Sequence, residues 1–232
     1  MIRTRRAAFA AAALAAATCL AGLGVWQLER RAWKHELIAA VDARTHAASV
    51  AAPGPASWPQ IDAGTDAYRR VNAIGRFDHD RETLVQAVTE RGAGYWVLTP
   101  LVTKDFTVLV NRGFVPVDKR DPKSRAPYPG TAAVTGLLRM SEPGGAFLRS
   151  NNVAAGRWYS RDVMAIARAR RLGQVAPYFI DADNSPNPGG YPVGGLTAVR
   201  FNDHHMVYAL TWFGLCALSL FFAWRLWHMR EE

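Results

Sequence analysis

Two adjacent histidines, His204 and His205, stand at the start of a long apolar run and are candidate ligand-binding residues. The run Met206–Trp224 contains 19 residues without a formal charge, enough for a helix to cross the ~30 Å hydrocarbon core of a bilayer. At helical spacing, His205, Tyr208 and Trp212 share one face, so an imidazole is followed by two aromatic rings. Because a neutral imidazole binds iron or copper, this face suits a flat, apolar ligand with a metal at its centre.

A second apolar run, Ala7–Trp26, lies near the other end and has 20 uncharged residues. The apolar core of a cleaved signal peptide is usually shorter, about 7–15 residues, so we predict a retained membrane helix. Positive charges stay on the cytoplasmic side of a membrane. They precede the first run and follow the second, at Arg3, Arg5, Arg6, Arg225 and Arg230.

These charges predict that both termini are cytoplasmic and that the middle of the chain lies outside, in the periplasm of a bacterium. The predicted location is the inner (plasma) membrane. The predicted segments are a cytoplasmic N-terminus at 1–6, a transmembrane helix at 7–28, a periplasmic domain at 29–203, a second transmembrane helix at 204–225, and a cytoplasmic C-terminus at 226–232.

The middle of the chain alternates short strand-like runs with turns. One helix is predicted, at Trp158–Leu172, with Gly173 ending it. Many short strands with one helix indicate an α+β domain of mainly antiparallel strands between the two membrane helices. The strands are predicted at Tyr68–Phe77, Glu82–Thr89, Gly94–Val102, Thr107–Val115, Thr131–Arg139 and Ala176–Ala182.

Charge and cysteine content narrow the possible functions. The net charge is +9, but the arginines are scattered or flank the apolar ends, which favours contact with anionic lipid rather than nucleic acid. Both cysteines, Cys19 and Cys216, fall inside the apolar runs, so the middle has no disulfide framework.

No GxSxG, phosphate-loop or HExxH motif is found, and we expect no enzymatic activity. The triplet Asp78–Asp80 is a weak metal-site candidate, because a DHD turn is usually solvated.

The outer end of the first apolar run must lie at the same depth as the histidine pair, and it carries Trp26, Gln27 and Arg30. Either Arg30 or Arg31 could bind a carboxylate through two hydrogen bonds, and a haem propionate is such a group. The alternative is that His204 and His205 are interfacial residues that only contact lipid headgroups.

Several short motifs in order make the chain resemble the Surfeit locus protein 1 family of cytochrome c oxidase assembly factors. The resemblance covers nearly the whole length. The matching residues are Gly24, Trp26, Gln27, Arg30, Trp33 and Lys34; Tyr68-Arg69, Gly75 and Phe77; Gly94-Tyr95 and Thr99–Leu101; Val110–Gly113 and Val115-Pro116; Trp158-Tyr159 and Asp162; Pro177-Tyr178 and Asp181; and Asn202, His205, Tyr208-Ala209 and Thr211-Trp212.

The resemblance implies that the protein binds haem a and helps it enter subunit I of the oxidase. It implies His205 as the iron ligand, with His204 as the alternative. Trp26, Tyr208 and Trp212 would pack the ligand, and Arg30 would bind a propionate. Subunit I, the lipid bilayer and haem a synthase are the expected partners. Two other functions stay open: a cofactor-free scaffold for subunit I, and a copper-delivery factor using the histidine pair.

Overall fold

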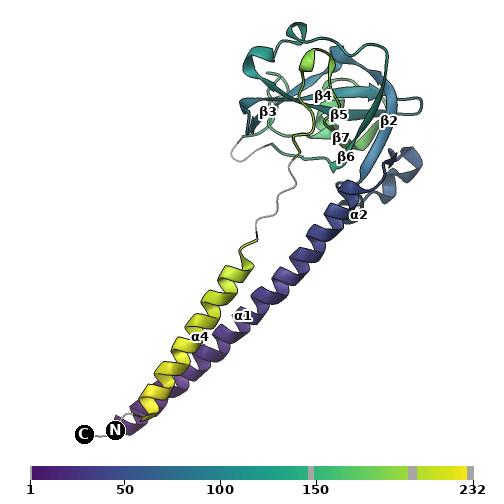
Figure 1. Cartoon of the computed structure of the whole chain (residues 1–232). Coiled ribbons are helices and arrows are strands. Elements are labelled where there is room, and N and C mark those ends of the chain that lie inside the picture. Colours follow the sequence, from purple (N-terminus) through teal and green to yellow (C-terminus); the bar gives the residue numbers. More distant parts are fainter. Residues whose placement is uncertain (1, 146–148, 198–202, 229–232) are drawn as a thin grey trace. The chain divides into compact units, whose positions relative to one another are not determined.

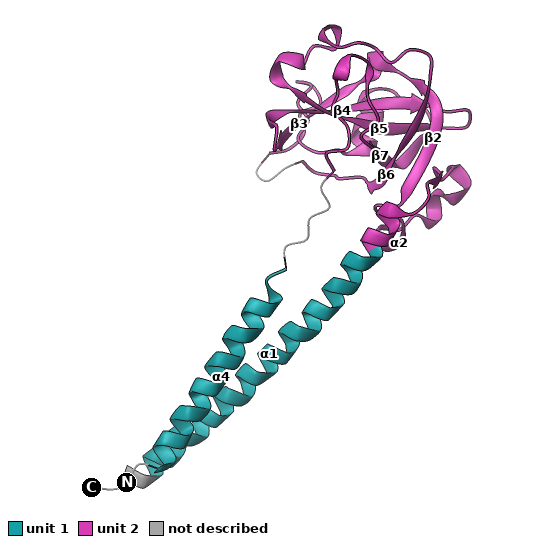
Figure 2. Ribbon diagram, in the orientation of Figure 1, with its two compact units in different colours: residues 1–40, 199–232 teal, residues 41–198 magenta. Residues whose placement is uncertain are grey.

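The computed structural model describes residues 2–145, 149–197 and 203–228, and divides the chain into two compact units. The first unit contains residues 1–40 and 199–232, and the second contains residues 41–198 (Figure 2). Asn202 and Arg230, which the sequence analysis names, lie outside the described residues.

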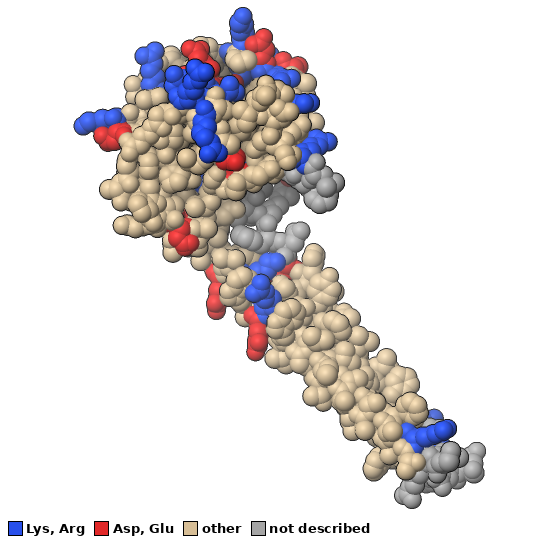
Figure 3. Space-filling view, turned by 180° about the vertical axis from the view of Figure 1, so that it is seen from behind, with Lys and Arg blue, Asp and Glu red and all other residues tan. Residues whose placement is uncertain are grey.

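The first unit is a pair of antiparallel helices (Figure 1). Helix α1 runs from Ile2 to His46 and α4 from His205 to His228, and both are long and apolar enough to span a membrane. Helix α1 continues without a break through the predicted end of the first span at residue 28. Figure 3 shows a long uncharged surface along the pair, with charged side chains at its ends.

The second unit is built on a seven-stranded sheet that closes into a barrel (Figure 1). Its strands occur in the order β1-β2-β6-β7-β5-β4-β3, and a second pairing of β2 with β4, at Arg76–Val102 and Phe77–Leu101, closes the ring. Pairings are antiparallel except β1–β2 and β5–β7. The strands are β1 Val50–Ala51, β2 Arg70–Phe77, β3 Thr83–Thr89, β4 Gly92–Val102, β5 Thr107–Pro116, β6 Thr131–Met140 and β7 Val175–Ala182.

Two apolar cores hold this barrel together. The first fills its interior and includes Val71, Leu101, Val110 and Tyr178. The second lies between the sheet and the short helix α3 (Val163–Ala169), where Trp158 and Ile166 pack. Strand β5 contributes to both, because Val108 and Val110 face the first core and Leu109 faces the second. A strand buried on both faces has no polar alternation.

The predicted helix Trp158–Leu172 is wrong at both ends, because the helix forms only at Val163–Ala169. The carbonyl of Trp158 accepts a hydrogen bond from Gln86 N at 2.8 Å, so this residue extends alongside β3 instead. Asp162 then caps the helix by accepting from Ala165 N. Arg171 adopts φ +51°, so the helix stops before the predicted Gly173 end.

Short helical segments connect the strands of the barrel. Helix α2 (Ala63–Asp66) begins where the Asp62 side chain accepts from Gly64 N. Single 3-10 turns follow at Pro55–Gln60, His79–Arg81, Val117–Lys119, Pro122–Ser124 and Pro188–Gly190.

Candidate functional site

The two membrane helices pack along a seam with a seven-residue repeat. On each helix the more buried positions recur at alternating intervals of three and four residues, the pattern of a left-handed helix pair. Several of them are small, which lets the two backbones approach closely. They are Ala10, Ala13, Ala17, Leu20, Gly24, Gln27 and Arg31 on α1, and His205, Ala209, Trp212, Cys216, Ser219, Ala223 and Leu226 on α4.

Gly24 lies on this seam and packs against a ring of α4. A Cβ atom at this position would lie 2.6 Å from Cε1 of Phe213, so a larger residue would require the ring to move. By contrast, a Cβ atom at Gly22 would meet no heavy atom within 4 Å. The glycine that begins the Gly24–Gln27 motif therefore lets Phe213 pack against the backbone of α1.

His205 lies at the end of the seam where α4 begins and contacts α1 directly. Its Nδ1 lies 2.7 Å from Oε1 of Gln27. With the amide oxygen as the acceptor, Nδ1 carries the proton and Nε2 keeps its lone pair. Among the described residues, no hydrogen bond involves Nε2. A metal-binding histidine usually has this arrangement, in which the second ring nitrogen donates to an oxygen that fixes the ring.

Asp203 organises a second group of polar side chains beside the start of α4. Its Oδ1 accepts from His205 N at 3.0 Å, and Oδ2 lies 2.7 Å from His35 Nε2. Arg31 Nε lies 3.7 Å from the same oxygen. The hydrogen bond from His205 N, followed by that from His35, lowers the pKa of Asp203 from its ordinary value. Asp203 is therefore an ionised cap for α4 near neutral pH.

Of the predicted aromatic and cationic residues, Trp26, Tyr208 and Arg30 lie beside the seam, and Trp212 belongs to it. Trp26 and Tyr208 are 53 % and 54 % exposed, whereas Trp212 is half-buried. The Arg30 guanidinium lies over the Trp33 ring, 4.1 Å from its centroid. Trp26, Arg30 and Trp33 follow one another at i, i+4 and i+7 on one face of α1.

Residues of α4 flank the seam on that same side. Arg30 immediately precedes the seam residue Arg31, and Tyr208 immediately precedes Ala209. In an antiparallel helix pair, these two positions lie on the same side of the seam. His204 is exposed one turn before Tyr208, and its carbonyl accepts from Tyr208 N. The arrangement is an exposed aromatic and cationic surface next to His205.

Gln27, Asp203 and His35 belong to this site but were not predicted as binding residues. Gln27 could have been found from its place beside Trp26 in the family motif. The pairing of Asp203 with His35 has no local signal, because the two residues are 168 positions apart.

The DHD triplet does not assemble a metal site in the part of the chain that the structure describes. Nε2 of His79 lies 3.3 Å from the Tyr128 amide nitrogen, and its Nδ1 lies 3.5 Å from Arg112 Nη1. Arg112 is almost fully buried, and burial lowers the pKa of its guanidinium to about 10. Asn187 Oδ1 accepts from two of its nitrogens, at 3.2 and 2.8 Å. His79 is thus part of the packing around a buried arginine.

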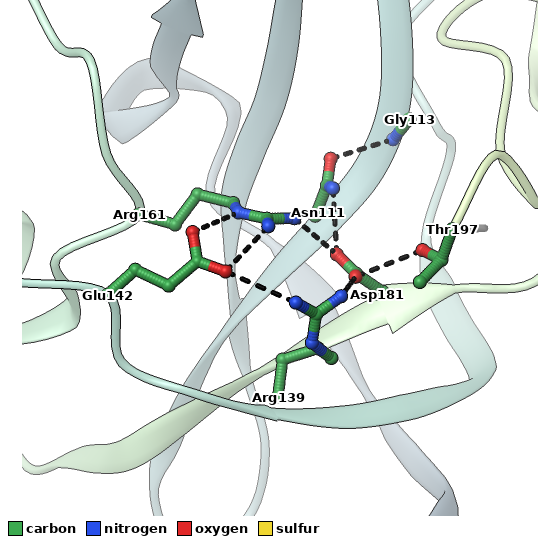
Figure 4. A network of polar contacts seen from close by, with 7 residues as sticks. All are labelled: Asn111, Gly113, Arg139, Glu142, Arg161, Asp181 and Thr197. Carbon is green, nitrogen blue, oxygen red and sulfur yellow. Dashed lines mark hydrogen bonds and ion pairs between the residues drawn. The ribbon is translucent and has the colours of Figure 1, made fainter. Parts of the chain in front are cut away.

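A buried carboxylate, Asp181 of β7, binds side chains from four other segments of the barrel domain (Figure 4). It accepts from Asn111 Nδ2 at 2.8 Å and from Thr197 Oγ1 at 3.0 Å. Arg139 and Arg161 bind its two oxygens at 2.8 and 3.3 Å, and both arginines also bind Glu142. Burial opposes the charge on Arg161, but Asp181 and Glu142 outweigh it and raise the pKa of the guanidinium. This network is charge-balanced and stabilises the fold.

The fold and the candidate site define a membrane protein with two terminal apolar helices and a β-barrel domain between them. The SURF1 family model matches residues 14–217, and the chain belongs to this family.

Curated relatives agree with this assignment. Surfeit locus protein 1 of Rattus norvegicus is 38 % identical over 225 residues, covering 88 % of this chain and 71 % of the rat protein. The Homo sapiens protein of that name is 36 % identical over 85 % of this chain and 70 % of its own length. The Takifugu rubripes protein is 35 % identical over 85 % of this chain and 88 % of its own length.

Proposed function

We propose that this protein is an assembly factor for haem–copper cytochrome c oxidase, with no catalytic activity of its own. It holds haem a at the outer ends of its two membrane helices and assists its insertion into subunit I. The observation that carries the proposal is the 2.7 Å contact between His205 Nδ1 and Gln27 Oε1. Membership of the SURF1 family supports the assembly role through what the family resemblance implies.

The described residues fit a haem as cargo. The Gln27 contact fixes the imidazole tautomer whose Nε2 has a lone pair, and that nitrogen can bind the iron of the haem. Trp26 and Tyr208 offer exposed rings that would pack against the macrocycle or its apolar tail. Trp212 would support the imidazole from within the seam. Arg30 would bind a propionate, since a guanidinium that stacks on Trp33 keeps its N–H edge for a carboxylate.

The proposed topology follows from the arginines that flank the two spans. Both termini are cytoplasmic, the barrel is periplasmic, and the membrane is the inner one. The haem-binding residues would then lie at the periplasmic interface, where a ligand can contact both lipid and the outer part of an oxidase subunit.

The test compares two variants that each lose one imidazole at neighbouring positions. Detergent-purified protein from cells that make haem a is examined by absorption spectroscopy. We expect His205→Ala to lose at least about tenfold of the bound pigment per protein, a typical result of removing a direct metal ligand. We expect His204→Ala to keep most of it, because His204 is exposed and makes no seam contact.

The opposite outcomes are equally informative. Full pigment in His205→Ala, or equal loss in both variants, would contradict the ligand assignment. A wild-type protein that co-purifies with subunit I but carries no haem would instead support the cofactor-free scaffold. Copper at one equivalent in the wild type, lost in His204→Ala, would support copper delivery.

A further inference from the structure

Within the described residues, no strand pairs beyond Gln86 with the edge of β3 that faces away from β4. Its pairing with β4 leaves the backbone groups of Gln86 and Val88 facing away from the barrel, because these residues alternate with those bonded to β4. The Gln86 amide donates to Trp158 O, where the chain runs parallel to β3 at a single bridge. The chain then turns away, since Asn151 Oδ1 accepts from both Tyr159 N and Ser160 N. Within the described residues, the Val88 amide has no hydrogen-bond partner.

A groove of ≈ 660 Å³ extends from this part of β3 across the facing residues of β4 to Val117, and its lining includes apolar and aromatic side chains. Val88 is 87 % exposed and Val117 is 60 % exposed, although both are large apolar residues. Tyr95 and Tyr159 also line the groove. A smaller hollow of ≈ 100 Å³ shares Gln86 and Tyr95 with it and extends the concave surface toward Trp158. Exposed apolar side chains along an unpaired strand edge are typical of a binding surface.

The charged side chains that line the groove and the adjoining hollow are all arginines. Arg149 lies over the Tyr159 ring at 5.6 Å, and Arg120 lies over the Tyr95 ring at 5.3 Å. Arg157 lines the adjoining hollow. No aspartate or glutamate is among the described residues that line either hollow. Arg149 Nη1 also donates to Gln86 Oε1 at 3.5 Å. The other N–H groups of a stacked guanidinium can still bind a carboxylate, so these arginines favour an anionic partner.

We propose that β3 binds an extended, acidic segment of a partner protein by strand addition. The backbone of that segment pairs with the outward carbonyl of Gln86 and with the outward groups of Val88, beyond the Trp158 bridge that already uses the Gln86 amide. Its alternating apolar side chains pack on Val88 and Val117, and its carboxylates bind the arginines. The proposed segment is anionic and β-prone, which is the combination that the groove complements. This inference concerns the barrel alone and does not depend on the haem proposal.

The test uses the full-length protein in detergent and a fluorescent seven-residue peptide of alternating valine and glutamate. Fluorescence anisotropy should show saturable binding that weakens as salt concentration rises. The same peptide N-methylated at alternate amides should bind at least about tenfold more weakly, because it cannot pair along its backbone. A valine–lysine peptide should not bind, since its charge matches that of the groove.

Variants at Val88 of β3 distinguish the contribution of its backbone amide to peptide affinity from that of its side chain. Val88→Pro removes the outward N–H without removing a bond to β4, since proline is tolerated on strand edges. We expect this variant to bind the peptide at least about tenfold more weakly. Val88→Thr, which keeps the amide, should stay within about threefold of the wild type.

Charge variants complete the experiment. We expect Arg149→Gln with Arg157→Gln to weaken peptide binding about tenfold, and Arg168→Gln on α3 to leave it unchanged. Absent binding to the wild type, or equal affinity for the N-methylated peptide, would overturn strand addition. Binding of monomeric dihexanoylphosphatidylglycerol that depends on Arg149, with no binding of the acidic peptide, would identify a lipid-headgroup site instead.

Discussion

The barrel and the helix pair use their polar side chains in opposite ways. In the barrel, Asp181 is buried and accepts hydrogen bonds from four side chains, two of them arginines. In the helix pair, His205 makes one side-chain contact, with Gln27, and lies next to exposed rings. A buried, fully bonded ion has no capacity left for a ligand, whereas a half-buried imidazole does. This difference shows where in the molecule substitutions should affect folding and where they should affect binding.

The largest loss of folding stability is expected from Asp181→Asn in the barrel. The change keeps the shape of the side chain but leaves Arg139 and Arg161 with Glu142 as their shared carboxylate. Removing one partner of a buried ion pair typically costs about 3–5 kcal/mol. Chemical denaturation of the detergent-purified protein should show this loss. The exposed Asp105→Asn is the control and should stay within about 0.5 kcal/mol of the wild type.

Gly24→Val should disturb the packing of α1 against Phe213 of α4. Its side chain would overlap the Phe213 ring, and overpacking of this kind costs about 1–3 kcal/mol. Gly22→Val is the matched control, because it makes the same change on the same helix in open space. Spin labels on α1 and α4 would report the distance by electron paramagnetic resonance. An unchanged distance in Gly24→Val would contradict the seam.

Gln27→Ala should reduce haem retention without removing the proposed ligand. Loss of a residue that orients a metal ligand typically weakens binding about 10–100-fold. Gln27→Glu keeps an oxygen acceptor for His205 and should retain more pigment than Gln27→Ala. Titration of the purified variants with haem, followed by absorbance, would measure the order. Equal affinity in both variants would show that the Gln27 contact does not support haem binding.

The smallest effect is expected from Asp203→Asn, which should change the thermal midpoint of unfolding in a pH-dependent way. The folded-state pKa of Asp203 lies below its ordinary value. Its contribution to the stability of the fold is therefore present above about pH 4 and is lost as pH falls through the lowered pKa. Asp203→Asn should therefore lower the thermal midpoint near pH 6 and have a smaller effect near about pH 3. A destabilisation that grows toward low pH would contradict the cap assignment.

Much of the barrel was predictable from local patterns. Strand β2 was expected at Tyr68–Phe77 and forms at Arg70–Phe77, because its apolar residues alternate with a period of two. The closure of β2 onto β4 was not predictable, since it depends on the register of strands that are distant in sequence. The helix around Val163 was overextended for a related reason. Trp158 continues its periodic pattern but is bonded to Gln86 of β3.

The candidate site was predictable to a lesser extent. His205 was identifiable because an ionisable residue at a membrane boundary is unusual. Its contact with Gln27 spans 178 positions and became visible only when the helices were paired. The stacking of Arg30 on Trp33 follows from their spacing on one helix face, but no pattern in the sequence pointed to it.

Strand β5 has a consequence for natural variation in this chain. Most strands in a barrel have every second residue in water, as β2 does in part, so half of their positions accept neutral change. In β5 every residue from Val108 to Val115 is buried. Neutral substitutions cannot accumulate in this segment, because none of these residues faces solvent. A saturation mutagenesis map should therefore show one uninterrupted intolerant block at β5 and an alternating pattern at β2.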